Sequence, residues 1–350
     1  MKRFVFILKQ KAILLLCSAV FAGAMASCNS ILDFDEGDCT VEYRVKFKYD
    51  YNMKYANAFA NEVNTITLYA FDKNGKFVYQ RTEEGEPLKA EGYTMKIDVD
   101  PGVYHLVAWA GVSEKSFAVP LMTQGVSDID ELSVKTKRLL DQRTPDGAYV
   151  VPGDNYKLSP LWHAESQQTT FTRTGGRQQV ATLSLTKNTN NIRIVLQQVG
   201  DKPIDVDQFN FSITDDNGWM DYHNQLLKDD MLKYLPFYRS SGTVNTRTRA
   251  DGSKEVTSVA VAQITTARLI ANKHSILHIT NKETGKTVLA IPLIDYLLLT
   301  KSYEHVIEDQ EYLDRQDEYA MTFFLDERDT WLNTTIVING WTIRLNDTGL

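Results

Sequence analysis

Polar and apolar residues alternate with a period of two in most of the chain after residue 38. The first clear case is "TVEYRVKFKY", which places Val41, Tyr43, Val45, Phe47 and Tyr49 on one face and polar or charged residues on the other. A period of two is typical of a β-strand with one buried face. This stretch therefore predicts a half-buried strand.

Turn-prone residues separate further stretches of the same kind. Hairpins are predicted around residues 72–75, around Pro101-Gly102, after "SILHIT" at "NKETGK", and at Asn339-Gly340, where Asn-Gly is a strong hairpin signal. Convincing helical patterns occur in "LIDYLLLTKSYEHVI" and "EDQEYLDRQDEYAM", and a short helix is expected within residues 128–140. Strands should therefore greatly outnumber helices.

The fold class follows from this excess of strands over helices. Many short strands in two halves predict a mainly β protein with two tandem antiparallel β-sandwich domains and a few short helices. The polar residues 186–191 interrupt two alternating runs and are interpreted as the junction, which gives domains of residues 39–187 and 188–350. No repeat of 20–50 residues is visible, which argues against a solenoid or a propeller.

Residues 1–27 have the features of an export signal. A positively charged start precedes 15 apolar residues, a stretch too short to span a bilayer comfortably. It ends in "MASC", with the small residues Ala26 and Ser27 before Cys28, the pattern at which bacterial lipoprotein signals are cut. We expect cleavage between Ser27 and Cys28 and a covalent diacylglycerol and N-acyl lipid on Cys28. The alternative is a plain secretory signal with a chance cysteine.

The cysteine count agrees with a lipoprotein. Cys17 lies in the signal, Cys28 is the acylation candidate, and Cys39 has no obvious partner. An exported protein without disulfides must fold on its core alone. Several acyl chains on one residue hold a protein firmly to a membrane that it does not span. Residues 28–38, which contain four acidic residues, are interpreted as an acidic tether.

Composition and charge exclude several classes of protein. With 43% hydrophobic and 24% charged residues, the chain is neither disordered nor collagen-like. The net charge is −7 and becomes more negative when the basic residues 1–27 are removed. A surface this acidic, without a basic stripe, argues against nucleic acid as a partner.

The usual motifs of catalysis and metal binding are missing. There is no G-x-S-x-G, P-loop, H-E-x-x-H or C-x-x-C. His274 and His278 are four residues apart in a predicted strand, where roughly 13 Å separates them, too far to share one ion. The acids of "EDQEYLDRQDE" are interpreted as a solvated helical face rather than a calcium site or a carboxylate pair. No catalytic residue, metal or cofactor is therefore expected apart from the lipid.

The aromatic residues leave an alternative open. Trp109, Trp162, Trp219, Trp331 and Trp341 are candidates for a platform that stacks on sugars, which would make the chain a surface lipoprotein that binds glycan or host matrix. Core packing explains Trp109, and sheet packing explains Trp341, without any ligand. A third alternative, an exported hydrolase with dispersed acids, has the least support.

In its ordered motifs the chain resembles the FimB-type fimbrial anchor subunits, the lipoproteins of type V pili in Bacteroidales. The matching stretches are "VEYRVKFKYDYNM", "ITLYAFDKNGKFV", "PGVYHLVAWAG", "LWHA", "LTKNTNNIRIVL", "DQEYLDRQDEYAMTFFLD" and "INGW". In the family's order, they are spread across nearly the whole of residues 28–350. The resemblance implies two transthyretin-like β-sandwiches, lipid anchoring to the outer membrane through Cys28, a place in the fimbrium as pilus anchor or minor subunit, and no catalysis.

The resemblance also implies partners. Type V pilins polymerise when a donor strand of one subunit fills a groove that opens in another after proteolytic removal of an N-terminal strand, a form of β-strand complementation. An anchor cannot discard that segment without losing its lipid. We therefore hypothesise that the strand with Val41, Tyr43, Val45, Phe47 and Tyr49 is retained, so that pilin subunits join at one end only. The edge at which they join, either "GWTIRLND" or another, is left open.

Overall fold

The structure is a computed structural model in which residues 41–151, 156–174, 176–200, 202–248, 254–301 and 307–345 are described. The chain divides into two compact units. One consists of Met1–Glu42 and Thr174–Gln179, and within it the Glu42 amide donates to the Arg177 carbonyl at 2.9 Å. The other, Tyr43–Arg173 and Val180–Leu350, contains nearly all of the elements below.

Two sheets are formed mainly by residues before 188. The larger has the order β12-β10-β5-β2-β3: β12 (Thr186–Lys187), β10 (Trp162–Phe171), β5 (Gly102–Ala110), β2 (Thr65–Phe71) and β3 (Phe77–Glu84). The smaller has the order β11-β1-β4: β11 (Gln178–Ser184), β1 (Glu42–Lys48) and β4 (Met95–Ile97). Rings of the two sheets meet where Tyr43 of β1 lies 4.8 Å from Phe171 of β10, centroid to centroid.

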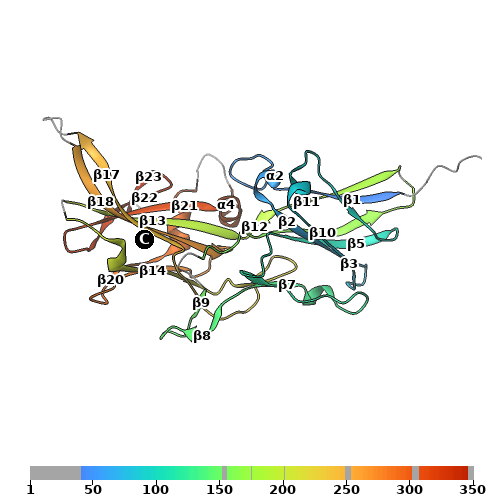
Figure 1. Cartoon of the computed structure of the whole chain (residues 1–350), viewed down its shortest axis with the longest axis horizontal. Helices are drawn as coiled ribbons and strands as arrows, with labels where there is room; N and C mark the ends of the chain where they lie inside the picture. The colour runs from blue at the N-terminus through green and yellow to red at the C-terminus, as the bar shows by residue number, and fades with distance from the viewer. Residues whose placement is uncertain are drawn as a thin grey trace, which may run out of the picture. The chain divides into compact units, whose positions relative to one another are not determined.

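Two six-stranded sheets are built mainly from later residues (Figure 1). One has the order β17 (Tyr238–Thr248), β18 (Lys254–Ala267), β13 (Thr189–Gln198), β21 (Glu318–Leu325), β22 (Trp331–Ile338) and β23 (Trp341–Arg344). The other has the order β20 (Thr287–Pro292), β19 (Ile276–Asn281), β14 (Phe209–Asp215), β16 (Leu232–Tyr234), β9 (Tyr149–Val151) and β8 (Leu139–Arg143). Alternate residues of β13 and β14, such as Ile194 and Phe211, are buried in one core.

The predicted mainly β fold with few short helices is confirmed by these sheets. Two strand pairs, β13 with β21 and β16 with β9, are parallel, so the expectation of wholly antiparallel sheets is wrong at these places. Parallel neighbours need a long crossover. The chain provides one in each case, because other strands lie between the partners in sequence.

Strands from before residue 188 also join sheets of the later half. A small sheet has the order β15 (Trp219–Asp221), β7 (Ser133–Thr136) and β6 (Phe117–Ala118), and β9 pairs with β16. Val134 and Val151 are buried in the same core as residues of β13 and β14, because these short strands are too small to form a core of their own. The division at residues 187 and 188 stays a prediction, and the strands of residues 117–151, which precede it, all lie in sheets with strands that follow it.

A buried ion pair fixes this segment. The Arg138 guanidinium donates to both carboxylate oxygens of Asp229, at 2.9 and 2.6 Å, and both side chains are almost fully buried. Burial alone raises the pKa of Asp229, but the hydrogen bonds and charge of Arg138 outweigh it and lower the pKa below its ordinary value. Removing one partner of such a pair leaves an uncompensated buried charge.

Three of the predicted hairpins are confirmed, those between β2 and β3, between β19 and β20, and between β22 and β23. The hairpin predicted at Pro101-Gly102 is wrong. β4 and β5 flank this turn but enter different sheets, because β4 pairs with β1 whereas β5 pairs with β2 and β10. The polar residues 186–191 are not one continuous loop, since β12 and the start of β13 lie within them.

The helices are short: α2 (Phe59–Glu62), α3 (Leu293–Leu298), α4 (Asp309–Arg315) and the 3-10 turns η1 (Glu86–Lys89), η2 (Ile129–Glu131) and η3 (Val206–Gln208). Both convincing helical patterns contain a helix, although residues 318–321 belong to β21. The helix expected within residues 128–140 shrinks to η2. Its capping box of Asp128 and Glu131 starts a helix, but β-branched Val134 and Thr136 then favour β7.

Asp215, at the end of β14, is a buried acid. It is 1% exposed, and its Oδ1 accepts a hydrogen bond from the Asp216 amide at 2.8 Å. Burial raises the pKa of Asp215 to about 7. The folded state therefore keeps this proton up to near pH 7, whereas the unfolded chain releases it near pH 4. Stability from this group is present at low pH and is lost as the pH rises from about 4 to 7.

The substitution Asp215→Asn is expected to remove this loss. The amide cannot ionise and can still accept the hydrogen bond, so the variant should be stabilised over the wild type by roughly 2–4 kcal/mol at pH 8 and by less at pH 5. The measurement is the Tm of both proteins at the two pH values. Asp98→Asn, at an exposed position, serves as control. A Tm difference of equal size at pH 5 and pH 8 would disprove the assignment.

Candidate functional site

The predicted N-terminal strand is present as β1. Tyr43, Val45 and Phe47 lie on its buried face, Tyr49 is buried directly after it, and Val41 lies half-buried directly before it. The strict alternation in the sequence thus corresponds to one face of the strand turned into the core. The predicted lipidation and cleavage residues, Cys28 and Ser27, lie outside the described residues.

β1 is the middle strand of its sheet. It pairs with β4 on one side, in the register of Tyr43 with Ile97 and Val45 with Met95, and with β11 on the other. Its Arg44 side chain is held as well, because Nε donates to Thr94 Oγ1 at 2.8 Å. Where both edges are paired, as along Tyr43–Val45, the strand leaves no free groove beside it.

Aromatic packing also stabilises β1. The Phe47 and Phe59 rings stack with centroids 5.9 Å apart, and the Tyr49 ring meets the Trp162 ring edge-on at 5.9 Å. Aromatic pairs of this kind contribute about 0.5–1.5 kcal/mol beyond the area that they bury. β1 is therefore anchored by its face as well as by its two edges.

Lys187 is the last residue of β12, just before β13, and its side chain is largely buried. Lys187 Nζ lies 5.3 Å from the centre of the Trp162 ring and 3.2 Å from the Glu62 carboxylate, and it also pairs with Asp317. Burial alone lowers the pKa of Lys187, but the two carboxylates outweigh it and raise the pKa above its ordinary value. Lys187 is therefore charged and ties α2 and β10 to the segment that enters β21.

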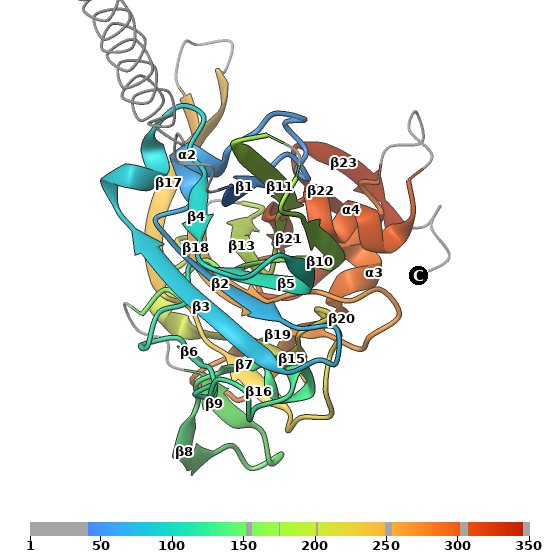
Figure 2. The same cartoon turned by 90° about the vertical axis from the view of Figure 1, so that its right-hand side faces the viewer.

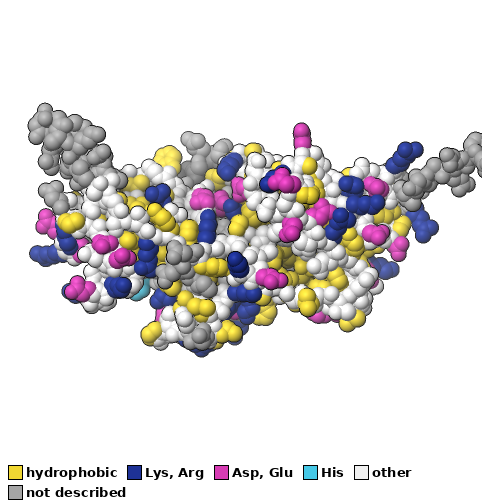
Figure 3. Space-filling model, viewed as in Figure 1, with side chains coloured by type: hydrophobic (Ala, Val, Ile, Leu, Met, Phe, Trp, Pro, Cys, Tyr) yellow, Lys and Arg dark blue, Asp and Glu magenta, His cyan; other side chains and the backbone are white. Residues whose placement is uncertain are grey.

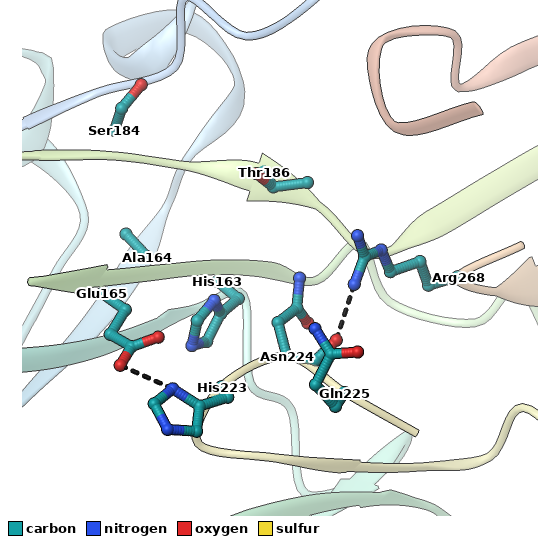
Figure 4. Close-up of a pocket in the computed structure, with 9 residues that line it drawn as sticks. All are labelled: His163, Ala164, Glu165, Ser184, Thr186, His223, Asn224, Gln225 and Arg268. Carbon is teal, nitrogen blue, oxygen red and sulfur yellow. Dashed lines mark hydrogen bonds and ion pairs between the residues drawn. The ribbon is translucent and has the colours of Figure 1, made fainter. Parts of the chain in front are cut away.

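A polar pocket of about 240 Å³, which we call the junction pocket, includes Thr186 of β12 (Figure 4). Its residues are His163, Ala164, Glu165, Ser184, Thr186, His223, Asn224, Gln225 and Arg268. β10 provides the first three, and the turn after β15 provides His223, Asn224 and Gln225.

Glu165 is the centre of an interaction network in this pocket. Its Oε1 lies 2.6 Å from His105 Nε2 and 2.7 Å from His223 Nδ1. Burial alone raises the pKa of Glu165, but the hydrogen bonds from the two imidazoles outweigh it and lower the pKa. His163, which is buried and contacts the Tyr222 carbonyl at 2.8 Å, has its pKa lowered to about 4 by burial, so it is neutral at pH 7.

Amides and an arginine complete the network. The side chains of Asn188 and Asn224 exchange two hydrogen bonds, at 2.6 and 3.2 Å. Arg268 donates to both oxygens of Asp314 at 2.7 Å and to the Asn224 carbonyl at 2.6 Å. These polar groups satisfy one another, so the arrangement is suited to holding strands together.

The sequence does not reveal this network. His105, Glu165, His223 and Arg268 come from four separate parts of the chain, and only the strand pairing brings them together. The acidic stretch also differs from its prediction, because Asp314 of α4 is 7% exposed and paired rather than on a solvated face. Among the described residues, no three His, Cys, Asp or Glu side chains are grouped so that they could hold a metal ion.

The tryptophans range from buried to exposed, and Trp219 and Trp331 are half-buried. Trp109 and Trp162 are at most 1% exposed, so they belong to the core, whereas Trp341 is 70% exposed at the start of β23. Trp341 borders a groove of about 610 Å³, the C-terminal edge groove, whose lining is Met53, Leu299, Thr300, Lys301, Tyr312, Gln316, Asn339, Trp341, Thr342 and Ile343.

The described surface and helices add two findings. Basic and acidic side chains are interspersed over the face shown in Figure 3, without a stripe of one sign. In the part of the chain that the structure describes, every helix is too short or too polar to cross a membrane.

Known proteins similar to this chain include fimbrial and adhesive proteins. The minor fimbrium anchoring subunit Mfa2 of Porphyromonas gingivalis is 21% identical over 325 residues, which are 92% of this chain and 91% of that protein. The solved structure of the fimbrial anchor protein Mfa2 from the same organism has a TM-score of 0.61 at 17% identity, with 87% of this chain and 99% of that chain covered.

Two solved structures from Bacteroides thetaiotaomicron are more similar in sequence. One is described as a candidate adhesin and has 35% identity and a TM-score of 0.74, covering 88% of this chain and 98% of its own. The other is described as a candidate polysaccharide-binding protein and has 33% identity and a TM-score of 0.74, covering 89% of this chain and 100% of its own.

The family comparison agrees with the resemblance found in the sequence. The profile of the fimbrillin-A associated anchor proteins Mfa1 and Mfa2 matches residues 35–347, nearly the whole chain after the predicted signal. The chain therefore belongs to the family of fimbrillin-A associated anchor proteins Mfa1 and Mfa2.

Proposed function

We propose that this chain is a lipid-anchored subunit that attaches a strand-exchange pilus to the outer membrane and terminates it. Its family is one of fimbrial anchor proteins, which associates the chain with the fimbrium and with other fimbrial subunits. The proposal adds three points: acylation of Cys28, binding of pilin by β-strand complementation, and termination of the polymer.

The observation that carries the proposal is the position of β1. A pilin that loses its N-terminal strand exposes a groove for the next donor strand. In this chain β1 is paired with β4 and β11 and its apolar face is buried, which supports the proposal that it keeps that position filled. In sequence, the residues before β1 lead back to Cys28. β1 is therefore the strand through which the predicted lipid would hold the folded protein. A subunit of this kind can receive or offer a strand at another edge only, and the polymer ends there.

Glycan binding through exposed aromatics is the alternative. One relative is described as a candidate polysaccharide binder. In this chain, however, Trp109 and Trp162 are buried, and the exposed Trp341 stands beside an apolar groove rather than within an aromatic platform. These positions favour the anchor over the sugar binder. Trp109 and Trp162 pack in the core, and the polar groups of the junction pocket bond to one another. Both features support a structural protein rather than a hydrolase.

The first prediction from this proposal concerns the lipid. Cys28→Ala is expected to abolish acylation, so that the protein and long pili attached to it are shed into the medium. The measurement is the ratio of pilin in the culture supernatant to pilin on the cells. Cys39→Ala is the matched control and should leave the pili on the cells. Pili that stay on the cells in the Cys28→Ala strain would contradict lipid anchoring.

The second prediction concerns β1. An arginine-specific protease should leave the bond after Arg44 intact in the folded protein, because the backbone there is paired on both sides. The same bond should be cleaved in urea, which provides the control for accessibility. Mass spectrometry of the products gives the answer. Release of the segment before residue 45 from protein that otherwise stays folded would show that β1 is not retained.

A further inference from the structure

β23 ends a six-stranded sheet and has one unpaired edge. It forms a hairpin with β22 around Asn339 and Gly340, in the register of Ile338 with Trp341 and Ile336 with Ile343. No described strand pairs with its other side. The sheet therefore stops at a row of backbone groups that another strand can use.

The register shows which backbone groups face outward. In a hairpin with a two-residue loop, the residues that close the loop form the hydrogen-bonded pair, and pairing alternates from there. Trp341 and Ile343 therefore direct their backbone groups to β22, whereas Thr342 and Arg344 direct theirs to the free edge. An added strand would bond to Thr342 and Arg344.

Two other edge strands, β3 and β20, carry features that oppose strand addition. The edge strand β3 bears Arg81, Glu83 and Glu84, and Arg81 Nη1 donates to the Lys96 carbonyl at 3.2 Å. The edge strand β20 ends in Pro292. Charges and proline are the usual means by which proteins block unwanted strand addition. β23 reads Trp-Thr-Ile-Arg, with a charge only at its end.

The C-terminal edge groove runs beside this edge. Trp341, Thr342 and Ile343 form one side of it, and Tyr312 and Gln316, within and directly after α4, contribute to the rest. Figure 2 shows β22, β23 and α4 close together on one side of the molecule. The lining is mostly apolar, so the groove offers room for apolar side chains that point inward from an added strand.

The charges around the groove favour an incoming strand with an acidic residue. No carboxylate is among its lining residues, and its charged positions are basic: Lys301 lies in the groove and Arg344 at the end of the edge. Lys301 is paired with Asp309, but Arg344 is exposed and has no ion-pair partner among the described residues. An acidic residue on the incoming strand would complement Arg344, although the protein as a whole has a net charge of −7.

We propose that the free edge of β23 and the C-terminal edge groove receive an extended segment of another fimbrial subunit. The segment alternates apolar and polar residues, pairs with the backbone of Thr342 and Arg344, inserts its apolar side chains beside Trp341, and carries an acidic residue next to Arg344. This inference rests on the proposed function, to which it adds the mating surface, one that is separate from β1.

The test uses synthetic ten-residue peptides with alternating valine and threonine and an aspartate at each end, titrated into the purified protein while tryptophan fluorescence is recorded. A matched peptide carries lysines in place of the aspartates. The aspartate peptide should bind and shift the emission, and the lysine peptide should bind at least about tenfold more weakly.

Variants of β23 locate the binding. Thr342→Pro removes an outward N–H without touching the pairing with β22 and should weaken binding about tenfold or more. Arg344→Glu should reverse the preference between the two peptides. Arg193→Glu, exposed on the central strand β13 of the same sheet, is the matched control and should bind like the wild type. An unchanged Tm shows that each variant is folded.

Three results would overturn the inference: no binding of the aspartate peptide, equal binding by Thr342→Pro and wild type, or a peptide preference that Arg344→Glu leaves unchanged. Dimers of the wild type that Thr342→Pro dissolves would assign the edge to a second copy of this chain instead. Failure here is distinct from failure of the proposed function, because retention of pili through Cys28 is measured separately on cells.

Discussion

Backbone pairing on both sides of β1 is the constraint on which the account depends. A strand contributes a row of N–H and C=O groups that must find partners when buried, and β1 finds them in β4 and β11 at once. Its apolar face is buried at Tyr43, Val45 and Phe47, so moving it would expose both the core and the ladders. β1, the first described strand, is thus built into the fold. An anchor that bears load needs this property more than any chemistry.

Polar groups in and around residues 186–191, the predicted junction, follow the same principle. Lys187, Glu165 and Arg268 are each held by two or more partners from different strands. Buried polar networks that are fully satisfied specify one arrangement, because any displacement leaves a donor or acceptor without a partner. Residues 117–151 add strands to sheets of the later half, so the two halves share structure rather than only a linker.

The sequence predicts the fold class, β1 and three hairpins well, because each depends on local alternation and turn residues. It fails where distant segments decide the outcome. Pro101-Gly102 looks like a hairpin turn, but β4 and β5 find better partners elsewhere. Asp314 is predicted to lie on a solvated face, but it forms an ion pair with Arg268, which directly follows β18. His105, Glu165 and His223 carry no motif, and only the pairing of β5 with β10 and the turn after β15 unites them.

The central claim, that β1 remains in its own sheet while the subunit is part of a pilus, is tested most directly by hydrogen–deuterium exchange with mass spectrometry. Amide protection of residues 42–48 is compared in the isolated protein and in shed pili that contain it. The account predicts slow exchange of these amides, close to the most protected strands of the protein, in both states. Fast exchange in either state, or protection that appears only after assembly, would contradict it.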